Sequence, residues 1–209
     1  MRVRPISPAL LVREVAERID ARPRTGWVRV AVDGAPPSRP GWLADELVAP
    51  LKLRGRPVVR VSAADFLRPA SLRLEHGRTD PDVFYDDWLD VGGLRREVLD
   101  PLGPGGSGRV LPALWDSVAD RAYRLPHQEL PEGGVLLLDG TLLLGRGLPF
   151  EVSVHLWLSE AALARGTGED ERWRLPAYAR YEREARPRRV ADIVVRADRP
   201  GHPALQVSG

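Results

Sequence analysis

The chain has 209 residues, of which 43% are hydrophobic and 29% are charged, and its formal net charge is +2. This length and composition suit one well-buried globular domain and exclude a disordered chain. The small charge argues against a strongly basic nucleic-acid binder, and the absence of cysteine excludes disulfides, thiolate metal sites and cysteine nucleophiles.

No apolar run approaches the ~20 residues that a membrane span requires. Residues 1–8 contain no apolar segment of signal-peptide length. We therefore expect a cytoplasmic protein with neither a membrane nor a nucleic-acid partner.

The first part of the chain predicts a strand, a helix and a second strand after an opening helix. Pro8–Ala21 has apolar residues at helical spacing, and Pro23 ends the pattern. Trp27–Val32 is predicted as a buried strand, Trp42–Leu53 as a helix and Val58–Ser62 as a second strand. This β–loop–α–β order is the unit that builds parallel sheets.

The rest of the chain continues the alternation of helices and strands. The apolar run Val135–Leu138 is typical of a central strand that is buried on both faces. The other predicted elements are a helix over Asp90–Leu99, a strand over Val152–Leu158, a short helix after Ser159, a helix over Pro176–Ala185 and a strand over Ala191–Val195. We expect one domain over residues 27–209, with a lid-like polar segment near 165–175, and a helical extension over 1–26 packed on it.

Short motifs lie at the ends of these elements, in the segments Val30–Gly34 (VAVDG), Val61–Pro69 (VSAADFLRP), Asp80–Tyr85 (DPDVFY), Leu136–Gly140 (LLLDG) and Ala191–Val195 (ADIVV). In their order and spacing they resemble the uridine kinase family, particularly its compact bacterial members. The resemblance extends from Val28 to Leu205. It implies a three-layer α/β fold of the P-loop NTPase and nucleoside-kinase type, with a mostly parallel central sheet flanked by helices. It also implies a nucleoside or nucleotide as small-molecule partner and allows a homo-oligomer.

The phosphate-binding loop of this family reads Gly, four residues, then Gly-Lys-Ser/Thr. Aligning Gly34 with the first glycine puts Arg39 at the second glycine, Pro40 at the lysine and Gly41 at the hydroxyl residue. The lysine and hydroxyl that phosphoryl transfer requires are therefore missing, and prolines remove N–H donors. Two interpretations of the loop, Ser38 included, stay open: a rigid turn into a helix, or an anion site formed by Arg39 and the helix N-terminus.

The aspartate that activates the nucleoside hydroxyl in this family follows the second strand. Ala64 stands at its place, and Asp65 comes one residue later. A bulge could re-aim Asp65 as the base, or Asp65 could be a loop or capping residue. Asp139 follows a buried strand at its carboxyl end, where it could hold Mg²⁺ through water or cap the next turn.

The resemblance implies further ligand contacts. Asp80 is similar to the ribose-binding aspartate, although it could equally start the turn before Pro81. Phe66, Arg68, Tyr85 and Trp115 are substrate-binding candidates, of which the aromatic residues could instead be core. Arg165, Arg172 and Arg174 stand where the family's lid supplies phosphate-binding arginines, or they form a solvated face.

Three hypotheses follow for the function. The first is a degenerate kinase that keeps a nucleoside-sized cleft and is impaired in phosphoryl transfer, as in a pseudokinase. The second is an active phosphotransferase that uses Asp65 as base, Asp139 for Mg²⁺ and arginine for the lysine, with Mg-ATP as cofactor. The third is a non-kinase enzyme that reuses the cleft. The scattered histidines show no zinc-site spacing, and the sequence predicts no other cofactor.

Overall fold

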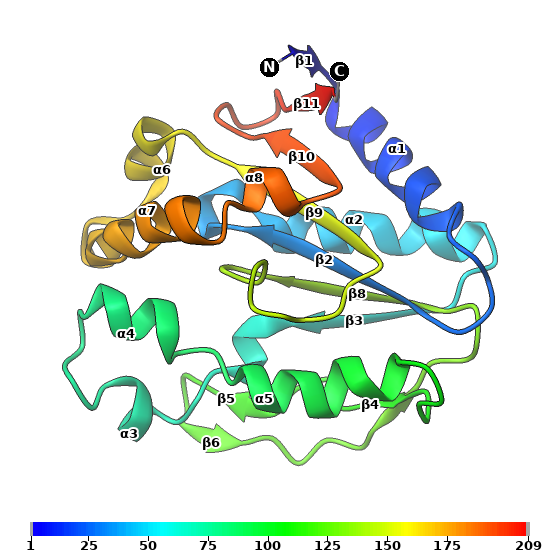
Figure 1. Ribbon diagram of the computed structural model, residues 1–209, viewed down its shortest axis with the longest axis horizontal. Helices are drawn as coiled ribbons and strands as arrows, with labels where there is room; N and C mark the ends of the chain where they lie inside the picture. The colour runs from blue at the N-terminus through cyan, green and yellow to red at the C-terminus, as the bar shows by residue number, and fades with distance from the viewer. Residues whose placement is uncertain (1, 208–209) are drawn as a thin grey trace.

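A seven-stranded sheet runs through the middle of the molecule in the computed structural model, which describes residues 2–207 (Figure 1). The strand order is β1-β11-β10-β9-β2-β8-β3. Strands β10, β9, β2, β8 and β3 are parallel, whereas β11 and β1 are added antiparallel at one edge. The strands of the sheet are β1 (Arg2–Pro5), β2 (Val28–Gly34), β3 (Val58–Ser62), β8 (Val135–Gly140), β9 (Val152–Trp157), β10 (Ile193–Arg196) and β11 (Ala204–Val207).

Helices cover both faces of this sheet. On one face α1 (Pro8–Asp20) packs beside α2 (Pro40–Leu53). The helices against the other face are α4 (Pro81–Asp86), α5 (Val91–Leu94), which continues as the helical turns η3 (Arg95–Leu99) and η4 (Asp100–Leu102), and α7 (Leu175–Glu184). The shorter helices are η1 (Pro36–Ser38), η2 (Ala63–Phe66), α3 (Ala70–Arg73), α6 (Glu160–Gly166), η5 (Glu169–Arg174) and α8 (Pro187–Val190). The expected fold class, a mostly parallel sheet flanked by helices, is confirmed.

The two-residue repeat of a strand explains why the apolar run at β8 is continuous. Val135 and Leu137 pack against α1 and α2, whereas Leu136 and Leu138 pack against α5 and η3 on the opposite face. A strand at the centre of a parallel sheet is covered on both faces, so both alternating sets must be apolar.

Some elements depart from the sequence-based expectation. The antiparallel strands β1 and β11 were not expected, and they bring the two described ends of the chain together (Figure 1). Helix α2 begins at Pro40, two residues before the predicted Trp42, because proline suits a first helical position. The polar segment after α6 forms the short helix η5. Two short antiparallel strand pairs before β8 were also not expected. They are β4 (Arg109–Val110) with β7 (Gln128–Glu129) and β5 (Trp115–Asp116) with β6 (Arg121–Ala122).

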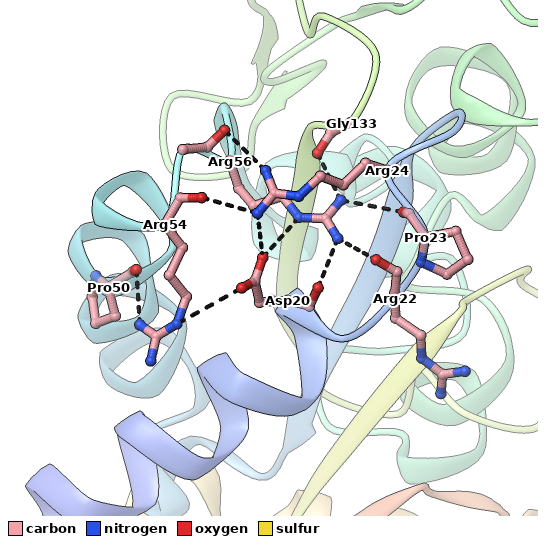
Figure 2. A network of polar contacts seen from close by, with 9 residues as sticks. Asp20, Arg22, Pro23, Arg24, Pro50, Arg54, Arg56 and Gly133 are labelled. Carbon is pink, nitrogen blue, oxygen red and sulfur yellow. Dashed lines mark hydrogen bonds and ion pairs between the residues drawn. The ribbon is translucent and has the colours of Figure 1, made fainter.

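A buried arginine ties the end of α1 to the starts of two central strands (Figure 2). Arg56, which is 1% exposed, donates from Nε to Asp20 Oδ1 at 3.1 Å. Its Nη1 donates to the carbonyl oxygens of Gly133 at 2.9 Å and Pro23 at 3.3 Å. Arg24 also donates to Asp20, at 2.8 Å. The Nη2 of Arg56 donates to the carbonyl oxygens of Asp20 and Arg22. All the N–H groups of the Arg56 guanidinium are therefore directed at acceptors, which offsets the cost of burying its charge.

Among residues 2–207, no helix combines the length and apolar character needed to cross a bilayer.

Candidate functional site

A cavity of about 800 Å³ opens at the carboxyl ends of β2, β3 and β8. Its wall at one end is the loop Gly34–Gly41, with the start of α2. Its wall at the other end includes Arg73, Trp88 and Arg174. In open parallel sheets ligands bind beyond the carboxyl ends of the strands, at the point where the strand order reverses. Strand β2 lies at that point here, between β8 and β9.

The loop at the first end satisfies its own hydrogen bonds. The N–H of Ser38 donates to the carbonyl of Ala35 at 2.8 Å, and the N–H of Arg39 donates to that of Pro36 at 2.9 Å. The Ser38 hydroxyl also donates to the carbonyl of Ala35, at 2.7 Å. Pro36, Pro37 and Pro40 have no N–H at all. Of the N–H groups that would surround a phosphate in a functional loop, three are therefore absent and those of Ser38 and Arg39 are used within the loop.

The backbone around this loop is tight. A Cβ on Gly34 would lie 2.4 Å from Ser38 Oγ and 3.1 Å from Leu156. Arg39 has a left-handed conformation with φ 60°, which is the conformation that glycine adopts most easily. Its guanidinium lies 5.9 Å from the ring centre of Trp42. The loop thus keeps a glycine-type turn into α2 with an arginine at the turn.

The aspartate that was a candidate for Mg²⁺ is paired with an arginine. Arg60, on β3, donates from Nη1 to Asp139 Oδ1 at 2.5 Å and from Nε to Asp45 Oδ1 at 3.0 Å. Its Nη2 donates to the carbonyl oxygen of Gly41 at 3.3 Å. This one guanidinium neutralises both carboxylates that line the cavity.

The residues around Asp139 do not fit a magnesium ion. Mg²⁺ requires an octahedral set of oxygen ligands with several waters, and a guanidinium bound to the same carboxylate repels it. Gly41 has no hydroxyl, and the Ser38 hydroxyl is directed to its own loop. Within residues 2–207 no group of three acidic or histidine side chains is arranged to hold a metal.

The second end of the cavity is aromatic and cationic. Trp88 packs edge-on against Phe84 with ring centres 5.2 Å apart, and Trp173 lies 5.5 Å from Trp88. The guanidinium carbons of Arg73 and Arg174 each lie 5.0 Å from the ring centre of Trp88. Cations at this distance from a ring are attracted by its negative face. This end offers planar apolar surface and positive charge together.

Solved structures share this architecture. A possible uridine kinase from Bacillus stearothermophilus matches with a TM-score of 0.71 and 17% identity over 88% of this chain and 96% of that chain. A proposed fructose transport system kinase from Silicibacter sp. TM1040 matches with a TM-score of 0.56 and 24% identity over 89% and 95%. The protein YGR205w matches with a TM-score of 0.53 and 11% identity over 96% and 97%. This chain has the fold of a P-loop kinase.

No protein-family model matches the chain, and no curated protein matches it by sequence. The identities to the solved structures are low, so the likeness is one of fold. The resemblance to uridine kinases that the motifs indicated is confirmed at that level. The chemistry of this P-loop-kinase fold must therefore be argued from its own cavity.

The two residues at the position expected for a catalytic base differ in their place relative to the cavity. Ala64 lines the cavity, whereas Asp65 is not among the residues that line it. Burial raises the pKa of Asp65, and repulsion from Asp139 and Asp116 adds to the rise. No bulge re-aims the side chain, because η2 begins directly after β3 at Ala63.

The predicted substrate residues are spread around the cavity rather than gathered in it. Asp80 caps α4, where its Oδ1 accepts from the N–H of Asp82 at 2.9 Å and of Val83 at 3.0 Å. Phe66 is fully buried in the core below α5. Trp115 donates from its indole N–H to Asp120 at 3.1 Å.

The remaining predicted residues divide in the same way. Arg68 pairs with Asp87 at 3.2 Å outside the cavity lining, and Tyr85 is covered by the guanidinium of Arg180, 4.2 Å from the ring centre. Arg165 and Arg172 are exposed. Of the predicted residues, the cavity wall contains Gly34, Arg39, Gly41, Asp139 and Arg174.

Sequence reasoning missed three arginines that matter here: Arg60, Arg73 and Arg146, of which the last two line the cavity. Arg60 occupies a half-buried position on a strand that otherwise reads as apolar, and this interruption was the available signal. Arg73 and Arg146 lie in segments with no family motif, so nothing in the sequence marked them.

Reasoning from sequence also missed a buried polar network behind the loop. Asp33 Oδ2 lies 2.7 Å from Nδ1 of His155 and accepts from the Tyr181 hydroxyl at 3.0 Å. Glu182 lies 3.5 Å from Nε2 of His155. Burial alone would lower the pKa of His155, but Asp33 and Glu182 outweigh it and raise the pKa to about 9. Asp33 Oδ1 also accepts from the N–H of Leu143 at 2.9 Å, so the network fixes the turn after β8.

Proposed function

We propose that this protein binds a nucleoside- or nucleotide-type small molecule in its cavity and does not transfer phosphate from Mg-ATP. The observation that carries the proposal is the hydrogen bonding at the end of the cavity formed by the loop Gly34–Gly41, which we call the phosphate end. There three loop positions are prolines without an N–H, the N–H groups of Ser38 and Arg39 are used within the loop, and Arg60 holds the aspartate that would approach a metal. Phosphoryl transfer depends almost entirely on positioning and neutralising phosphate charge, and both requirements are unmet at this end.

The aromatic end supports the other half of the proposal. The cavity volume lies within the range of small-molecule sites, which are mostly apolar with a few convergent polar groups. Phe84, Trp88 and Tyr178 supply flat apolar surface for a planar ring. A cytoplasmic location and assembly into a homo-oligomer stay predictions from the sequence.

Calorimetric titration of the full chain with Mg-ATP, uridine, cytidine and their monophosphates tests the proposal. We expect heat of binding with at least one nucleoside or nucleotide acceptor and none with Mg-ATP. We also expect no phosphorylated product when Mg-ATP and uridine or cytidine are incubated together. Tight Mg-ATP binding with turnover at ordinary kinase rates, typically 1–100 s⁻¹, contradicts the proposal and favours an active enzyme with rearranged residues.

A further inference from the structure

The charges that line the cavity do not balance. The charged residues of its wall are four arginines and two aspartates, namely Arg39, Arg73, Arg146, Arg174, Asp45 and Asp139. Both aspartates are already bound by Arg60, which is not part of the wall. The cavity therefore presents an excess of positive charge to whatever enters it.

Arg73 is the most exceptional of these cations. It is 7% exposed, and no carboxylate within residues 2–207 lies within ion-pair distance of it. Its Nε donates to the carbonyl oxygen of Arg68 at 2.6 Å and its Nη2 to that of Ser117 at 3.4 Å, while Nη1 has no partner in the described part of the chain. A buried cation held only by neutral groups is costly unless a counter-charge binds beside it.

Arg174 approaches the same place from the lid side. It also contacts the face of Trp88, and its Nε is buried with no hydrogen-bond partner among residues 2–207. Glu171, an exposed side chain, pairs with the other side of this guanidinium through Nη1. The guanidinium carbons of both arginines lie 5.0 Å from the ring centre of Trp88, so the two cations are close together. Burial lowers the pKa of Arg73, the negative charge of Asp120 raises it, and the positive charge of Arg174 lowers it.

We propose that Arg73 and Arg174, over the ring of Trp88, form a subsite for an anionic group such as a phosphomonoester. On this inference, which rests on the proposed ligand-binding function, the ligand is a nucleotide or another planar anion rather than a neutral nucleoside. A guanidinium presents N–H donors in a plane that matches the oxygens of a phosphate. The subsite would lie at the aromatic end of the cavity, away from the loop Gly34–Gly41.

The test compares the affinities of uridine, uridine monophosphate, ribose 5-phosphate and inorganic phosphate by calorimetry at two salt concentrations. We expect the monophosphate to bind at least about tenfold more tightly than uridine, since one charge-assisted contact is worth that much. Its affinity should fall as salt rises. Arg73→Gln should remove most of the preference. Arg174→Gln should also reduce the preference for the monophosphate. Because the Arg174 side chain is more exposed than that of Arg73, this variant is less prone to misfold.

The matched control is Arg78→Gln, which removes an exposed arginine that does not line the cavity. We expect this variant to keep the preference for the monophosphate. Equal affinity for uridine and its monophosphate overturns the subsite and leaves the proposed function intact. Binding of ribose 5-phosphate without uridine supports the subsite and argues against a nucleoside-type ligand. Binding of no anion overturns the subsite.

Discussion

The two ends of the cavity have opposite polar chemistry. At the end formed by the loop Gly34–Gly41, the backbone N–H groups of Ser38 and Arg39 donate within the loop, and Arg60 binds Asp139. At the aromatic end, Arg73 and Arg174 each keep a side-chain N–H donor that has no partner in the described chain. The polar groups named at the loop end are therefore held by internal contacts, whereas those at the aromatic end keep donor atoms that are free within residues 2–207.

This difference bears on the proposal that the loop end does not bind the phosphates of Mg-ATP. Random loss of a phosphate site would leave unpaired buried groups, which cost free energy. Here the loop forms a short 3₁₀ turn, and the Asp139 carboxylate is bound in an ion pair with Arg60. The phosphate end is therefore a stable structure in its own right, and its contacts should be measurable as stability.

The largest effect on stability is expected when Arg60, at the phosphate end of the cavity, is substituted. Arg60→Gln leaves Asp139, whose side chain is 12% exposed, without its cation. We expect a loss of about 2–4 kcal/mol in the free energy of unfolding, somewhat below the value for a fully buried pair. Denaturant unfolding measures it, and Arg95→Gln, at the exposed Arg95–Asp100 pair, is the control, with an expected loss below about 1 kcal/mol.

The same Arg60→Gln variant tests whether the guanidinium excludes a metal. With the carboxylate free, we expect weak Mn²⁺ binding that the wild-type protein lacks, detected by electron paramagnetic resonance of the free ion. Equal Mn²⁺ binding by both proteins would show that the arginine does not control access to Asp139.

The next largest loss of stability is expected from close packing within the loop Gly34–Gly41. Gly34→Ala places a methyl group 2.4 Å from Ser38 Oγ and 3.1 Å from Leu156, so the Ser38 side chain, the loop or β9 must shift. Overpacking of this kind costs about 1–3 kcal/mol. Gly168→Ala is the matched control, since nothing lies within 4 Å of the position and its φ is −58°. A change in melting temperature no larger for Gly34→Ala than for Gly168→Ala would mean that the loop is loose.

A pH-dependent effect is expected from the network behind the loop. The pKa of His155 is raised to about 9, above its ordinary value, so its contribution to stability is complete below about pH 6.5 and is lost as the pH rises through 9. The charged and titratable groups around it are Asp33, Glu182, Tyr181 and Arg188. The contribution is on the order of 1–3 kcal/mol.

Chemical denaturation at pH 6.5, 8 and 9.5 checks this effect. We expect the wild-type protein to be more stable than His155→Gln at pH 6.5 and the difference to shrink by pH 9.5. Parallel curves for the two proteins across this range would mean that His155 is not charged in the folded state.

The sequence was sufficient for the fold because its signals are local or repetitive. The alternation of apolar strands with amphipathic helices predicted β2, β3, β8 and β9, and β3 matched residue for residue. The edge strands β1 and β11 were not predictable, because their pairing joins the two ends of the chain. A contact of that sequence separation leaves no periodic pattern to read.

The candidate site was less predictable, for a related reason. The altered loop could be read directly, since its chemistry lies in consecutive residues. The role of Asp139 depended on Arg60, which is 79 residues away in the chain. The positive end of the cavity depended on Arg73 and Arg174, which come from different helices. Only the folded chain brings these charges together.

The smallest effect is expected at Arg68, which the family resemblance had favoured as a substrate residue. Its guanidinium pairs with Asp87 at 3.2 Å, and the side chains of Arg68 and Asp87 are 42% and 50% exposed. Exposed pairs of this kind contribute about 0.2–1 kcal/mol, so Arg68→Gln should change stability by no more than that. Its backbone carbonyl, which accepts from Arg73, is retained in the variant. We therefore expect the affinity for uridine monophosphate to stay within about twofold of wild type, whereas a loss as large as that of Arg73→Gln would place Arg68 at the aromatic end of the cavity.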